Sequence, residues 1–134
     1  MGAEIHGLDL LIGRVDVMRR RIARPEPALR ESVTLALGSI ERNFEAEGRP
    51  KWAPLKPSTL KHKGGRGSIL TNTGRMRRSN QAQIGNRGWT IRNRAPYSKY
   101  TLGTSRMPAR EFLVHQPEDV PMHGDIFTTY FYGR

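Results

Sequence analysis

The sequence predicts a single α+β domain in which two N-terminal helices pack on a small antiparallel β-sheet. Residues 1–46 repeat apolar side chains at helical spacing, whereas residues 69–115 contain short apolar stretches separated by turn signals. Between them, residues 47–68 are rich in proline and basic residues and follow neither period. A length of 134 residues makes one domain the default, and a hydrophobic content of 36% indicates a modest core.

Two helices are expected, over about residues 4–23 and 27–46, separated by Pro25. The apolar positions that share one face of the first helix are Ile5, Leu8, Ile12, Val15 and Ile22. Those of the second helix are Leu29, Val33, Ala36, Leu37, Ile40 and Phe44. Because helices of this length are marginal in isolation, we expect both apolar faces to be buried.

Residues 47–68 are expected to form a long, extended basic arm. Its three prolines oppose regular structure, although "PSTL" allows a short helical turn capped by Ser58 or Thr59. Trp52 has two interpretations. The scarcity of other apolar residues favours an anchor that packs the arm onto the core, and the alternative is a ring that stacks on a nucleic-acid base.

A hairpin is expected within "QAQIGNRGWTIRN", with Ala82 and Ile84 on one arm and Trp89 on the other. "EFLVH", residues 111–115, predicts a further strand, which completes a β-rich part over residues 69–115. The aromatic C-terminal tail, residues 116–134, allows a short helix capped by Asp125 or an edge strand that docks on a neighbour.

The positive charge of the chain is concentrated in its middle. The net charge is +11, and residues 48–110 contain 15 Lys and Arg but no acid, while the rest has eight bases against 12 acids. Such self-repulsion indicates an anionic partner or charge spread over solvated loops. Nucleic acid is the first candidate for that partner, and a neighbouring subunit with acidic ends is the second.

Several classes of function are disfavoured. The chain has no cysteine, so it has no disulfide and no thiolate ligand or nucleophile. Its four histidines lack metal-ligand spacing, and we expect no catalytic residues, no metal, no cofactor and no enzymatic activity. No apolar run of membrane-spanning length and no signal peptide is apparent, so we expect a cytosolic protein, or one assembled in the cytosol, without a membrane partner.

Two segments contain short motifs in an order typical of one viral family. The first is "NFEAEGRPKWAPLKPSTLKHKGGRGSILTNTGRMRRS", residues 43–79, and the second is "APYSKYTLGTSRMPAREFL", residues 95–113. With the preceding helices, they resemble the phage virion morphogenesis family, the tail-completion proteins of Mu-like and related tailed bacteriophages. The second segment departs from the family pattern because no histidine follows its tyrosines.

This resemblance implies a structural virion protein, a tail-completion, tail-terminator or head–tail connector subunit at the neck. Such proteins commonly assemble as rings, often hexamers. The partners it implies are other copies, a tail-tube, sheath or head-completion protein, and phage DNA contacted without sequence preference. It also implies assembly in the host cytoplasm and location in the virion. A stand-alone, sequence-nonspecific nucleic-acid-binding protein is the alternative.

The resemblance also implies roles for individual residues. The arm would contact neighbouring subunits through Arg49, Pro50, Trp52, Pro54, Leu55, Thr59 and Leu60. The residues expected to face DNA or an acidic partner are Lys61, Lys63, Arg66, Arg75, Arg77 and Arg78. The second block contributes Tyr97, Tyr100, Gly103, Met107, Pro108, Arg110 and Phe112, with Phe112 buried where the chain enters a central strand.

Overall fold

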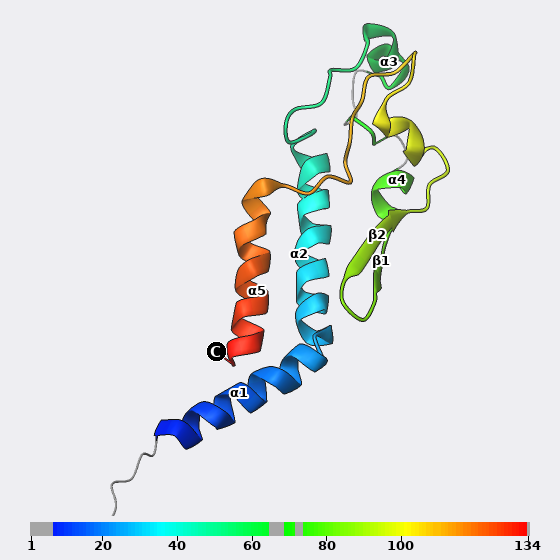
Figure 1. The fold of residues 1–134 in the computed structure, drawn as a ribbon. Coiled ribbons are helices and arrows are strands. Elements are labelled where there is room, and N and C mark those ends of the chain that lie inside the picture. The colour runs from blue at the N-terminus through cyan, green and yellow to red at the C-terminus, as the bar shows by residue number, and fades with distance from the viewer. Residues whose placement is uncertain (1–6, 65–68, 72–73, 134) are drawn as a thin grey trace, which may run out of the picture.

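The computed structural model describes residues 7–64, 69–71 and 74–133 (Figure 1). The helices are α1 (Gly7–Ala23), α2 (Glu26–Glu45), α3 (Pro57–His62), α4 (Arg75–Arg78) and α5 (Val120–Tyr132). The strands are β1 (Asn80–Ile84) and β2 (Trp89–Asn93), and two 3-10 turns are η1 (Ser98–Leu102) and η2 (Pro117–Asp119). The predicted α+β class is confirmed.

Helix α2 is the axis of the molecule. Figure 1 shows α5 along one side of α2 and the β1–β2 hairpin along the other, and both contact it. The predicted apolar face is buried at five of its six positions, with Leu37 half-buried. Helices of this length depend on tertiary packing, and α2 obtains it on two sides.

The hydrophobic core lies at the carboxyl end of α2. Phe44 and Phe112 are 0% and 1% exposed, and their ring centroids lie 5.1 Å apart. Trp52 packs edge-on against Phe44 at 5.7 Å. Gly48 makes this approach possible, because its φ is +104° and a Cβ there would lie 2.5 Å from the Trp52 backbone nitrogen.

The predicted hairpin is confirmed, and the structure gives its register. Ile84 pairs with Trp89 and Ala82 pairs with Ile91, and the turn closes with the Gly85 N–H donating to the Gly88 carbonyl at 2.7 Å. The inner side of β2 contributes Ile91 to the core. The hairpin therefore covers α2 with one face and leaves the other to solvent.

The predicted strand at residues 111–115 is wrong. The segment has no regular secondary structure and bends at Leu113. Side chains take the place of a strand partner: Trp52 Nε1 donates to the Glu111 carbonyl at 3.2 Å, and Asn43 Nδ2 donates to the Phe112 carbonyl at 2.9 Å. In the described part of residues 69–115, the hairpin accounts for all the strand structure. The β-rich part is thus smaller than expected.

The arm is also less extended than expected. Residues 57–62 form α3, which begins with Pro57 in its first turn, so neither Ser58 nor Thr59 caps it. The predicted glycine-rich end of the arm lies partly outside the described residues, at positions 65–68.

The C-terminal tail is a helix rather than an edge strand. Asp125 lies in the interior of α5, and Asp119 occupies the position that precedes the helix. The helix is attached to α2 through His123, whose Nδ1 lies 2.7 Å from Ser32 Oγ. The predicted cap by Asp125 is therefore wrong.

Helix α1 contradicts the expectation that both apolar faces are buried. Within Gly7–Ala23 no residue is buried, and Leu8, Leu11, Ile12, Val15 and Ile22 are each more than half exposed. The helix contacts α5 through Arg21, which donates to the Tyr130 carbonyl at 2.7 Å. Ile5 and the predicted start at residue 4 lie outside the described residues.

The packing of Trp52 predicts that the Trp52→Ala protein loses stability. Removal of a buried indole costs about 3–5 kcal/mol, and circular dichroism during urea unfolding will measure the loss. Tyr132→Ala is the matched control, because Tyr132 is 62% exposed and its removal is expected to change stability by less than about 0.5 kcal/mol. A stable Trp52→Ala protein would instead support a role for this ring in contacts with other molecules.

Candidate interaction surfaces

A polar network, here called the clasp, joins the end of α2 to residues 47–54 and 110–119. Arg49 is its centre. Its Nε donates to Asn43 Oδ1 at 2.9 Å, and its Nη2 donates to the Ser39 carbonyl at 2.9 Å and to Ser39 Oγ at 2.7 Å. Its Nη1 also reaches Glu118 Oε1 at 3.2 Å. Arg49 thus places most of its donors inside the chain.

Amide side chains extend the clasp to the segment before α5. Gln116 Nε2 donates to the Arg49 carbonyl at 2.7 Å and to Asn43 Oδ1 at 3.1 Å. Ser39 Oγ donates to Asp119, which also lies 3.8 Å from Arg42. Among the described residues, no buried side-chain nitrogen or oxygen lacks a partner. A fully satisfied network of this kind fixes the geometry of the loops that it joins.

Arg110 closes the other end of the clasp. This arginine is 7% exposed, and it donates from Nε to the Ala53 carbonyl at 3.0 Å and from Nη2 to the Pro54 carbonyl at 3.1 Å. The two motif segments that lie far apart in the sequence are therefore bound to each other. Phe112 is buried as expected, although it does not enter a strand.

These contacts change the assignment of the arm. Trp52 is in the core, as the packing interpretation predicted, and its ring is not free to stack on a base. Arg49 and Arg110 bind within the chain. Of the predicted arm positions, Pro50, Pro54 and Leu60 remain on the surface, and Leu55 and Thr59 are half-buried. In the second block, Pro108 and Gly103 are exposed.

The basic residues expected to face a partner are divided. Lys61 is exposed on α3, and Arg75 and Arg78 are exposed on α4, while Lys63 is half-buried and Arg66 lies outside the described residues. Arg77, which was expected to face a partner, instead binds within the chain. Its Nε donates to Glu41 Oε1 at 2.7 Å, and its guanidinium lies 5.6 Å from the centre of the Phe44 ring. The hydrogen bond to Glu41 raises the pKa of Arg77, which binds α4 to α2.

A groove of about 560 Å³ lies between α4 and η1. Its apolar lining includes Leu70, Met76 and Met107, together with Tyr97 and Tyr100, which are 42% and 46% exposed. Lys63 and Arg75 also contribute to its lining. Aromatic rings beside cations suit either a subunit interface or a nucleic-acid base next to its phosphate.

Gly103 shapes the loop that borders this groove. Its φ is +100°, and a Cβ at this position would lie 3.3 Å from the Cβ of Ala109. The loop folds back on itself, with the Arg110 N–H donating to the Thr101 carbonyl at 2.7 Å. The glycine thus has a conformational role in the second motif segment.

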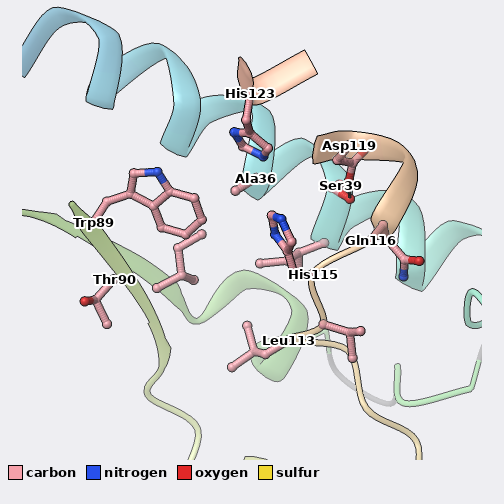
Figure 2. A pocket seen from close by; sticks show the side chains of 12 residues that line it. Ala36, Ser39, Trp89, Thr90, Leu113, His115, Gln116, Asp119 and His123 are labelled. Carbon is pink, nitrogen blue, oxygen red and sulfur yellow. Dashed lines mark hydrogen bonds between the residues drawn. The ribbon is translucent and has the colours of Figure 1, made fainter. Parts of the chain in front are cut away.

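A second cavity, of about 300 Å³, lies between α2, β2 and the segment before α5 (Figure 2). The imidazoles of His115 and His123 face each other across it, with ring centroids 5.5 Å apart. Trp89 Nε1 donates to Ser32 Oγ at 3.0 Å, and the same hydroxyl lies 2.7 Å from His123 Nδ1. Ser32 thus links the hairpin to α5 through α2.

Burial lowers the pKa of His123, and the charge of His115 lowers it further, against a smaller opposing effect from Asp119. Among the described residues, no group of three His, Cys, Asp or Glu is placed to hold a metal ion. None of the described helices is long and apolar enough to cross a membrane.

The residues that the sequence analysis missed are the polar groups on the buried face of α2. Ser32, Ser39 and Asn43 lie seven and four positions apart, so they share the face of the apolar residues. Polar side chains on a predicted apolar face require internal partners, which is the signal that could have identified them.

Comparison of the chain with protein-family models, with curated proteins and with solved structures gives no match.

The clasp predicts that Arg49→Ala destabilises the fold. The substitution leaves Ser39 and Asn43 without their charged donor, and hydrogen bonds to charged groups contribute about 1.5–3 kcal/mol each. We expect a loss of about 2–4 kcal/mol in urea unfolding, since such contributions are not additive. Arg94→Ala, which removes an exposed side chain, is the control and should unfold like the wild type. Equal stability of both variants would contradict the central position of Arg49.

The environment of His123 predicts a dependence of stability on pH. The folded state holds the pKa of His123 below its ordinary value of 6.5, so the unfolded chain takes up the proton first as the pH falls. Stability is therefore complete above about pH 6.5 and decreases as the pH falls towards the pKa of the folded state.

Unfolding measured from about pH 7.5 to about pH 5.5 should show a smaller loss for His123→Gln than for the wild type. His62→Gln, at an exposed position, should keep the wild-type slope. An unchanged slope in His123→Gln would assign the dependence to other groups.

Proposed function

We propose that this protein is a structural subunit of a tailed bacteriophage, a tail-completion or head–tail connector protein that forms a ring at the neck. The observation that carries the proposal is the separation of charge across α2. Residues 48–110, with 15 Lys and Arg and no acid, include α3, α4, the hairpin and η1. Residues 117–133, which form η2 and α5, contain three acids and no Lys or Arg.

Much of the basic part lies on the opposite side of α2 from α5, although Arg49 of the basic part pairs with Glu118. In Figure 1, α5 lies along one side of α2, and the hairpin and α4 lie along the other. The exposed acids Asp125 and Glu118 can attract the basic side of another copy, although Glu118 already pairs with Arg49. Such a contact is heterologous, and it closes into a ring when the rotation between neighbours allows.

The surface beside the charges suits a contact between protein subunits. Tyr97, Tyr100 and Met107 are exposed around the groove between α4 and η1. Exposed aromatic and methionine side chains are enriched at interfaces relative to other surfaces. We therefore place the α5 side of the neighbouring copy against this groove and the basic residues around it.

The excess of positive charge has a second use in such an assembly. The chain carries a net charge of +11, and residues 117–133 expose only Glu118 and Asp125 as acids, so a ring keeps a strongly positive net charge. Phosphate groups of DNA passing through the neck would neutralise part of it without any reading of sequence. A tail-tube, sheath or head-completion protein is the expected neighbour along the tail axis.

The second candidate is a stand-alone nucleic-acid-binding protein. The groove between α4 and η1 favours it, because tyrosines and cations are combined there, and the Lys99 ammonium also lies 5.3 Å from the centre of the Tyr100 ring. Stacking of a base on an aromatic ring is worth about 1–3 kcal/mol. This function requires no second copy of the chain.

Reversal of the charge of Asp125 on α5 tests whether the chain assembles through its acidic side. In native mass spectrometry of the full chain, we expect ring-sized assemblies for the wild type and a large loss of them for Asp125→Lys, which removes attraction on α5. Asp9→Lys, the same change on the exposed part of α1, is the control and should assemble normally. Short DNA duplexes are added in a parallel series.

The outcomes separate the two functions. A monomer that binds duplex DNA with steep salt dependence, and that is unaffected by Asp125→Lys, would support the nucleic-acid-binding protein. The position of the chain in a density map of the intact particle decides the location. Absence of the protein from purified virions whose formation does not require it would contradict the proposed function.

A further inference from the structure

The apolar face of α1 has the spacing of a coiled-coil seam. Leu8, Leu11, Val15, Met18 and Ile22 follow one another at alternating steps of three and four residues. This alternation places them at successive a and d positions of a heptad, the positions that insert between the side chains of a partner helix. Ile12 lies beside the seam and widens it.

The rest of the described chain leaves four of the five seam residues exposed, while Met18 is half-buried. Leu8, Leu11, Val15 and Ile22 are 55%, 56%, 55% and 57% exposed. The helix contacts α5 at one edge of the seam, through Arg21, whose guanidinium lies 5.6 Å from the centre of the Tyr130 ring. In Figure 1 the amino-terminal part of α1 extends away from α2 and α5.

The charges that flank the seam exclude a second α1 as a favourable partner. With Leu8 at position a, Arg14 and Arg21 occupy g positions and Arg19 occupies an e position. Parallel pairing would place Arg14 against Arg19 of the other copy, and antiparallel pairing would place the g-position arginines against each other. Like charges at these positions select against self-association.

From this geometry we infer that the α1 seam is the docking surface for an amphipathic helix of another protein, with apolar a and d residues and Asp or Glu at its flanking positions. Carboxylates at those positions would pair with Arg14 and Arg19. Arg19 now lies 2.9 Å from Asp16 in an exposed ion pair, and such pairs exchange at little cost. This inference goes beyond the proposed ring, because its partner is not a copy of the chain.

A lipid surface fits α1 less well. Helices that lie in a membrane interface combine aromatic residues on the apolar face with a strongly basic polar face. Gly7–Ala23 contains no aromatic residue, and its four arginines are accompanied by Asp9 and Asp16. Asp16 also partly neutralises Arg19 and Arg20, from which it lies 2.9 Å and 3.7 Å.

Two synthetic helices and two leucine substitutions test the inference. The probes are peptides of three heptads with Leu at a and d, one with Glu and the other with Lys at e and g. Fluorescence anisotropy with the full chain should show binding of the Glu peptide, and roughly tenfold or more weaker binding of the Lys peptide. Leu11→Asp should abolish the binding of the Glu peptide.

Leu10→Asp is the matched control. Leu10 neighbours Leu11 and is 74% exposed, but it lies off the seam, so the same substitution there should leave the affinity within about twofold. Circular dichroism checks that both variants keep the helical content of the wild type. If Leu11→Asp alone unfolds, Ile22→Ser replaces it as the seam variant.

Three results would overturn the inference. The first is no binding of the Glu peptide, or equal binding of both peptides. The second is a wild-type dimer in sedimentation that Leu11→Asp dissociates and Leu10→Asp does not, since a second copy would then cover the seam. The third is seam-dependent binding to anionic lipid vesicles in place of the Glu peptide.

Discussion

At the carboxyl end of α2, the side chains of Arg49, Asn43 and Gln116 bind one another and the backbone of two loops. The loops carry Trp52 and Phe112, and these rings pack on Phe44 to complete the core. Neither loop contains a strand whose partner could hold it in place. The polar network and the aromatic cluster therefore depend on each other, and the position of α5, which follows Gln116 directly through η2, depends on both.

This arrangement explains how a small chain accommodates a large excess of positive charge. The core uses few residues, most of them at one end of α2, so the basic segments can lie at the surface around it. Arg49, Arg77 and Arg110 are the exceptions, and each is compensated by a carboxylate or by backbone carbonyls. Several other cations of this region, such as Lys51, Lys61 and Arg94, are exposed, and their exposure to water lowers the cost of mutual repulsion.

The two candidate interaction surfaces, the basic side with its groove and the α1 seam, lie in different places and suit different partners. The basic side of the molecule, with its tyrosine-lined groove, favours a contact that is electrostatic in origin. The seam of α1 is apolar and narrow, with charge at its edges only, and therefore favours a helix. A subunit that contacts both its own neighbours and a different protein requires two such independent surfaces.

The sequence by itself determined the local elements: both N-terminal helices, the hairpin, and the class of the fold. Their periodic patterns and turn residues depend on neighbours in the chain, which a sequence displays directly. The scarcity of apolar residues in the arm also favoured the burial of Trp52, but only the tertiary structure decided that Phe44 and Phe112 are the rings it joins. The tertiary structure alone decided that Arg49, Arg77 and Arg110 bind internally, and that residues 111–115 pair with side chains in place of a strand. It also decided that α2 is covered on two sides while the α1 seam is left exposed. Many of these outcomes depend on contacts between residues far apart in the sequence, such as Arg77 and Glu41, 36 positions apart, and Trp52 and Glu111, 59 positions apart. A local sequence pattern does not specify which of several apolar or basic side chains will make a contact with a distant segment.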